Sequence, residues 1–148
     1  MGIVIIQDTR EQAPLDFRGI EGVDQVDVSG LAYGDYAGLV NGKLAPIIIE
    51  RKSIGDLFGT MGAGYVRFKR EMERAKKDNM TLILAVEGSY TDVWNGYERS
   101  QIEGPSMIKK LDTLYVKYDL FTWYCESRRV MARRIVGLFS AIDRAYEE

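Results

Sequence analysis

Glu50, Arg51 and Lys52 form a charged triplet directly behind the apolar run Ile47–Ile49. The run consists of β-branched residues, which predict a short buried strand. Charged side chains at the end of a buried strand are costly unless they pair or bind a metal. Glu50 and Lys52 are two residues apart, so they point to the same side of the strand, while Arg51 points away. A carboxylate beside an ammonium suits metal-dependent phosphodiester hydrolysis, because the carboxylate can hold a cation and the ammonium can bind the reacting phosphate.

A second carboxylate reaches the same place through a predicted hairpin. The segment 36–40 predicts a strand, and the Asn41-Gly42 pair that follows is a strong signal for a tight turn. Counting back from that turn, Asp35 faces Ile48 and lies diagonally from Glu50, about 7–8 Å away between backbones. The side chains of Asp35 and Glu50 can then close around one ion. A slip of one residue in this pairing would separate them.

Further candidates lie on either side of these two strands. Asp8 and Glu11 follow the first apolar run of the chain, where an acidic pair favours a site over an ordinary turn. The flat guanidinium of Arg10 suits both an acidic partner and a phosphate, and the sequence does not choose between them. Asp56 lies three residues after Ser53, a spacing typical of a helix cap, and the cap and a role in the site are compatible.

Taken in order, these motifs resemble the signature of the XPF family of structure-specific endonucleases. The resemblance implies a restriction-endonuclease-like α/β core that cuts DNA with Mg²⁺ or Mn²⁺ at junctions between duplex and single strand. Many family members carry a tandem helix-hairpin-helix domain after the nuclease, and we expect residues 1–148 to be a nuclease domain without it. The elements that carry the resemblance are Asp8-Thr9-Arg10-Glu11, Gly34-Asp35, Glu50-Arg51-Lys52 with Asp56, Arg67-Phe68 and the run Leu82–Glu87.

The resemblance also implies a division of roles. Asp35 and Glu50 are expected to hold the cation, with the carbonyl of Arg51 as a further ligand, and Asp8 to support it directly or through water. Lys52 is expected to hold the attacking water or to stabilise charge in the transition state. The side chain of Arg51 either buttresses the carboxylates or touches the substrate. The catalytic candidates are Asp8, Glu11, Asp35, Glu50, Arg51, Lys52 and Asp56.

Composition narrows the class of protein and of chemistry. The chain has no histidine, which excludes Ser-His-Asp and Cys-His mechanisms and histidine zinc sites and leaves hard-cation catalysis by carboxylates. With 148 residues and 46% hydrophobic content it can bury one sizeable core. Cys125 is the one cysteine, which favours a reducing compartment. No signal peptide or membrane span is recognisable, so we expect an intracellular protein.

The order of apolar segments predicts the fold class. Strands come first and then alternate with helices, which is typical of α/β proteins. We therefore expect a single domain with a mixed β-sheet flanked by α-helices, and polar loops at 59–64 and 89–104. The expected strands are 3–7, 25–29, 36–40, 45–50, 82–87 and 120–125, and the expected helices are 53–59, 65–78, 105–118 and 128–146.

The net charge of −2 and the pI near 5.3 are unusual for a nucleic-acid-binding domain. A local exception is a basic stripe on the helix predicted at 65–78, which either tracks phosphates or is an ordinary solvated face. We take Arg10, Arg67 and Arg70 as the candidates for binding substrate. The stripe consists of Arg67, Arg70, Arg74 and Lys77, and Phe68, Met72 and Ala75 on the other face should pack on the sheet.

The last third of the chain carries two amphipathic helices, whose combined apolar surface predicts a homodimer. The same helices can also be used entirely by the core of one chain. XPF-type nuclease domains pair through their C-terminal helices, so the resemblance favours the dimer. Two alternatives to a branch-specific nuclease stay open: a catalytically silent partner for DNA binding or dimerisation, and a nuclease without branch preference. The apolar positions are Ile108, Leu111, Leu114, Tyr115 and Tyr118, and then Val130, Met131, Ile135, Val136, Leu138, Phe139 and Ile142.

Overall fold

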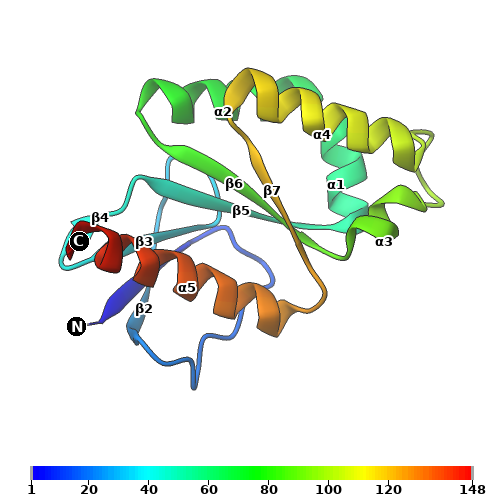
Figure 1. The fold of residues 1–148 in the computed structure, drawn as a ribbon. Coiled ribbons are helices and arrows are strands. Elements are labelled where there is room, and N and C mark those ends of the chain that lie inside the picture. Colours follow the sequence, from blue (N-terminus) through cyan, green and yellow to red (C-terminus); the bar gives the residue numbers. More distant parts are fainter. Residues whose placement is uncertain (1, 148) are drawn as a thin grey trace.

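A twisted sheet lies between two layers of helices in the computed structural model, which describes residues 2–147 (Figure 1). The strands are β1 (Ile3–Asp8), β2 (Val23–Ser29), β3 (Tyr36–Val40), β4 (Lys43–Leu44), β5 (Ile47–Ser53), β6 (Thr81–Glu87) and β7 (Phe121–Cys125). The helices are α1 (Ile54–Met61), α2 (Tyr65–Lys77), α3 (Tyr90–Trp94), α4 (Gly104–Tyr118) and α5 (Arg128–Glu147). Helices α1, α2 and α4 cover one face of the sheet, and α5 covers the other.

The sheet is mixed, as the sequence predicts. Its order is β2-β1-β3-β5-β6-β7, with β4 paired to β3 outside this path. Strand β3 is antiparallel to β1 and β5, whereas β5, β6 and β7 run parallel. Ile48 and Ile49 are both buried although they point to opposite faces, because helices cover both sides. Both faces of β1, β5 and β6 are therefore apolar, and the charged side chains of these strands occur at their carboxyl ends.

Most of the expected elements are present within a few residues, but the polar segment 89–104 is not a plain loop. It contains α3, which begins at a capping box in which Ser89 and Asp92 satisfy each other's backbone N–H groups. Helix α1 also extends to Met61, into the other expected loop. Both corrections have one physical reason: short helices fixed by caps and tertiary packing leave little hydrophobic periodicity in the sequence.

The hairpin pairs with a register different from the predicted one. Val40 pairs with Lys43 as expected, but farther along Tyr36 pairs with Ile49. By the same count Asp35 lies opposite Glu50, and the prediction that it faces Ile48 is wrong. The slip is of two residues, so the side chains of β5 keep the faces that the sequence predicts.

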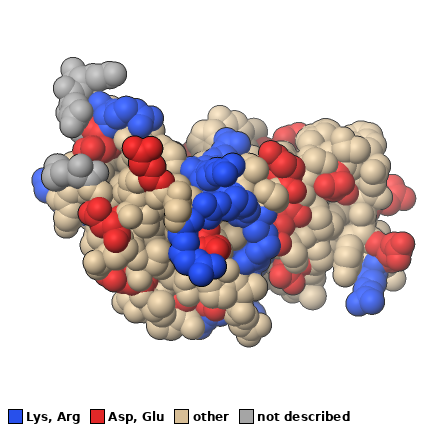
Figure 2. Space-filling view, turned by 90° about the horizontal axis from the view of Figure 1, so that it is seen from below, with Lys and Arg blue, Asp and Glu red and all other residues tan. Residues whose placement is uncertain are grey.

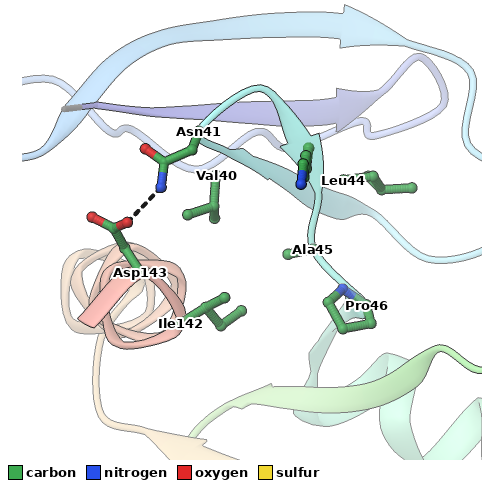
Figure 3. A pocket seen from close by; sticks show the side chains of 8 residues that line it. Val40, Asn41, Leu44, Ala45, Pro46, Ile142 and Asp143 are labelled. Carbon is green, nitrogen blue, oxygen red and sulfur yellow. Dashed lines mark hydrogen bonds between the residues drawn. The ribbon is translucent and has the colours of Figure 1, made fainter. Parts of the chain in front are cut away.

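Pro46 explains this slip. Ala45 still donates to the carbonyl of Gly38 on β3, but proline has no N–H with which to continue that ladder. The Pro46 carbonyl instead accepts from Thr81 at the start of β6. Figure 3 shows the corner from close by, with a cavity of about 450 Å³ between the hairpin and the end of α5. Val40, Leu44, Ala45, Pro46 and Ile142 line it, and Asn41 donates to Asp143.

The apolar stripe of helix α5 packs into the chain's own core. Met131, Ile135 and Phe139 are fully buried against the sheet, so a charge at Phe139 would disrupt the monomer and says nothing about a dimer. Among the side chains that the structure describes in the last third, the large apolar ones that stay exposed lie on α4 and β7. They are Tyr115, Val116 and Phe121. Within residues 2–147, no helix is long and apolar enough to cross a membrane.

Candidate active site

Two carboxylates and a lysine meet where β3 begins and β5 ends. Glu50 and Lys52 point to the α2 side of β5, and the Nζ of Lys52 lies 3.0 Å from Oε2 of Glu50. Only 8% of Glu50 is exposed. The Oδ2 of Asp35 accepts a hydrogen bond of 2.7 Å from the backbone N–H of Arg51, between the two. The predicted grouping of these three side chains is present.

Gly34 fixes the position of Asp35. Its φ is +76°, and a Cβ built there would lie 2.0 Å from Cγ2 of Ile48. Glycine is therefore required both by the backbone conformation and by the close approach of β5. The Gly34 N–H also donates to Oε1 of Glu71 at 3.0 Å, which ties this turn to α2.

Glu71 is a site residue that sequence reasoning missed. It projects from α2 beside Glu50 and brings a third carboxylate to the group. Its position four residues after Arg67 and three before Arg74 places all three on one helix face. That spacing was the available signal, but an acidic residue on a polar helix is normally solvated. Only the contact with Gly34, 37 positions away, distinguishes it.

Burial and mutual repulsion raise the pKa values of the central carboxyls. Desolvation, followed by the charge of Glu50, raises the pKa of Asp35 to about 7. Desolvation, followed by Glu71, raises the pKa of Glu50 to about 8 against the opposing effect of Lys52. The site thus holds more negative charge than its own cations balance.

This donor set fits a hard divalent cation. In the described part of the chain no three acidic, histidine or cysteine side chains form a ready-made metal cage. However, Asp35 and Glu50 supply closely spaced carboxylate oxygens, the ligand type that Mg²⁺ and Mn²⁺ prefer. Their raised pKa values indicate a place where added positive charge is favourable.

Asp8 is buried nearby but its oxygens are already engaged. Its Oδ2 accepts from the backbone N–H of Arg10 at 3.2 Å and from its Nε at 2.8 Å, and Oδ1 accepts from Leu31 N–H at 2.8 Å. The choice that the sequence leaves open for Arg10 is thereby answered in the free protein: it pairs with Asp8. The side chain of Arg10 stays 69% exposed. Asp8 therefore fixes the two loops that contain Arg10 and Leu31, and its oxygens are not free to bind a metal directly.

Arg51 points to the opposite face of the sheet, as predicted, and joins an ion-pair network there. Its Nε and Nη2 contact both oxygens of Glu11 at 2.8 and 2.6 Å, and Nη1 contacts Glu87 at 2.7 Å. Arg128 of α5 pairs with the same Glu87. Glu11 thus holds Arg51 from behind the site and does not reach the Asp35 side.

A cleft of about 300 Å³ opens between α2 and the segment before β3. Arg67 and Arg74 of the basic stripe line it, whereas Arg70 is exposed on α2 outside the lining. Asp56 is also exposed, and its N–H donates to Oγ of Ser53, so the helix cap is present. The lining residues are Asp8, Arg10, Ala32, Tyr33, Gly34, Asp35, Glu50, Arg67, Glu71 and Arg74.

A comparison with protein families matches the ERCC4 domain over residues 7–138. The chain belongs to the ERCC4 domain family. The match includes every candidate residue from Asp8 to Arg74. A comparison with curated proteins found no match.

Two solved structures of XPF from Aeropyrum pernix resemble this ERCC4 domain. One has a TM-score of 0.74 and 24% sequence identity, and covers 95% of this chain and 65% of that chain. The other, in complex with DNA, has a TM-score of 0.67 and 20% identity, with 96% and 65% covered. The chain thus spans about 65% of the length of these two structures. The likeness confirms the expected fold.

The pKa values give this ERCC4 domain an expected pH dependence in the presence of a chelator. The folded protein retains protons on Asp35 and Glu50 that the unfolded chain releases near pH 4. Because the folded-state pKa values are the higher ones, stability is lost as pH rises through them. The melting temperature should fall between about pH 5.5 and 8.5, and Asp35→Asn should flatten the decline. A melting temperature that rises over this range would contradict the assignment.

Proposed function

We propose that this chain is a Mg²⁺- or Mn²⁺-dependent endodeoxyribonuclease that hydrolyses phosphodiester bonds in branched or junction DNA. The observation that carries the proposal is the pair of Asp35, just before β3, and Glu50 on the neighbouring β5, with Lys52 at 3.0 Å from Glu50. Membership in the ERCC4 domain family supports it. The similar fold of an XPF solved in complex with DNA supports a DNA substrate.

Each side chain of the candidate site has a distinct role in the proposed reaction. Asp35 and Glu50 would hold the cation, with the Arg51 carbonyl as a further ligand and Asp8 acting through water. The bound cation supplies charge neutralisation at the phosphate and acidifies a coordinated water. Lys52, held by Glu50, orients the attacking water or stabilises the negative charge that builds on the phosphoryl oxygens. The 3′ or 5′ oxygen then leaves with a proton from water, giving one phosphomonoester and one hydroxyl end.

The arginines at the edges of the cleft would bind the DNA substrate. Arg67 and Arg74 line it together with the largely exposed Arg10, and Arg70 extends the same helix outward. Phosphate contacts of this kind position a duplex without reading its sequence. An intracellular location is part of the same proposal, because cellular DNA is the substrate that it names.

A cleavage assay tests the proposal directly. Purified protein is incubated with end-labelled flap, fork and linear duplex DNA in Mg²⁺, Mn²⁺ or EDTA. We expect cleavage with either metal, none in EDTA, and recovery when metal is added back. Faster cutting of flap or fork than of duplex would support branch preference, and equal rates would favour a nuclease without it. Full activity in EDTA would overturn the metal mechanism.

We further propose a homodimer through the last third of the chain, on the surface formed by α4 and the edge strand β7. Val116 is 79% exposed, and the rings of Tyr115 and Phe121 pack edge to face beside it at 5.4 Å. Val116→Asp should convert a dimer to a 16.8 kDa monomer in sedimentation at tens of micromolar. Val66→Asp on α2 is the control, because Val66 is also an exposed valine on a helix, at 57%. A wild-type monomer at that concentration would refute the dimer.

A further inference from the structure

A second basic surface lies on the far side of the sheet from the cleft. Its residues, which we name the arginine patch, are Arg18, Arg128, Arg129, Arg133 and Arg134. Figure 2 views the molecule from the side that α5 covers and shows Lys and Arg side chains gathered near the middle of that face. In a chain of net charge −2 such a concentration of one sign needs a reason.

The patch is held in place by contacts that keep its cationic groups at the surface. Arg128 donates to the carbonyls of Ala13 and Pro14, and Arg129 donates to the carbonyl of Asp16 at 3.0 Å. Backbone carbonyls fix a guanidinium without cancelling its charge. Arg128 also pairs with Glu87 and Arg18 with Asp16, so the uncompensated charge of the patch comes from Arg129, Arg133 and Arg134. Arg134 lies over the ring of Trp123, 4.4 Å from its centre, which also leaves the charge intact.

The same contacts connect the patch to the candidate active site. The segment 8–18 leaves the cleft at Arg10 and runs to the carbonyls that Arg128 and Arg129 hold. Beneath it, Arg128 shares Glu87 with Arg51, whose backbone N–H binds Asp35. The exposed Arg10 and the partly exposed Arg128 and Arg129 therefore lie at the two ends of one short segment.

We propose that the arginine patch binds the phosphate backbone of DNA outside the cleft, as a second contact that does not read sequence. The proposal rests on the proposed nuclease function and adds a path to it: a DNA arm leaves the cleft, follows the segment 8–18 and reaches the first turns of α5. Guanidinium groups suit phosphate oxygens, and several together give a strongly salt-dependent attachment. A second copy of this chain fits this surface less well. Two-fold pairing here would bring the positive patches of the two copies together, and they would repel each other.

The test compares DNA binding of two variants of the full chain. Arg129→Gln/Arg133→Gln removes two charges from one face of α5, and Lys109→Gln/Lys117→Gln removes two from exposed positions on α4, across the sheet. The dissociation constant for a labelled fork is measured with Ca²⁺ over a range of salt. The slope of the logarithm of the association constant against log salt should become less steep by about 1.8 in the patch variant, and the affinity should fall on the order of tenfold. The α4 variant should match the wild type, and Arg129→Lys/Arg133→Lys should restore most of the slope.

The outcomes separate this proposal from the proposed function. If the wild type binds and cuts DNA but the patch variant keeps its slope, the patch is refuted and the nuclease stands. If the wild type neither binds nor cuts DNA, both fail. If the patch variant changes the sedimentation coefficient while its salt slope stays the same, the surface joins copies of the chain and the DNA contact is wrong.

Discussion

Glu50→Gln and Lys52→Met should each reduce single-turnover DNA cleavage by about 10²–10³-fold or more, with the fold intact. Glu50→Gln keeps the shape of the side chain but removes the charge of a proposed metal ligand, which is also the partner of Lys52. Lys52→Met removes the ammonium and leaves the aliphatic stem. Because Glu50 is buried and its pKa is raised to about 8, its neutral replacement should leave the metal-free protein at least as stable at pH 8.

Glu73→Gln and Lys76→Met are the matched controls for these two variants. Both positions are exposed on α2 and carry the same changes of charge. They should retain full activity. Near-normal cleavage by Lys52→Met would remove Lys52 from the reacting phosphate, and a Glu50→Gln protein that still responds to metal at wild-type concentrations would remove Glu50 from the ligand set.

Arg51→Met should lower the free energy of unfolding by about 3–5 kcal/mol, because it leaves the buried Glu11 without a cation, although Glu87 keeps its pair with Arg128. The side chains of Arg51 and Glu11 are 11% and 3% exposed, so water replaces the lost partner poorly. Such a loss corresponds to a fall of about 10 °C in melting temperature for a domain of this size. Urea unfolding at pH 7 measures it directly.

Arg51→Lys should recover only part of the loss, because one ammonium does not reproduce the fork that spans both oxygens of Glu11. Arg18→Ala is the control. The pair of Arg18 with Asp16 is largely exposed, and its removal should change the unfolding midpoint little. Equal losses for Arg51→Met and Arg18→Ala would mean that the buried network contributes nothing special to stability.

The sequence predicted the parts of this molecule that depend on local pattern. Alternation and helical periodicity located the long elements, and the switch from Ile47–Ile49 to charged residues located the candidate site. The face of each side chain on β5 also followed from parity alone. The pairing partner of Asp35 did not, because it depends on how the corner at Pro46 resolves a missing hydrogen-bond donor.

The rest of the site depends on contacts between distant positions. Glu71 joins it only because α2 folds back over Gly34, and Oδ1 of Asp8 is engaged only because Leu31 lies beside it. The partnership of Glu87 with both Arg51 and Arg128 joins three separate elements. No local pattern predicts such meetings, since they follow from the topology of the sheet.

The corner between β4 and β5 also constrains how the length of this hairpin can vary among relatives or in engineered versions. Adding or deleting two residues near Pro46 preserves the alternation that presents Glu50 and Lys52 to Asp35. An odd change would present Arg51 in their place unless an irregular corner absorbs it. Insertions that survive selection here should therefore come in pairs or fall in the turn itself, and the hairpin is a poor place to graft a peptide of arbitrary length.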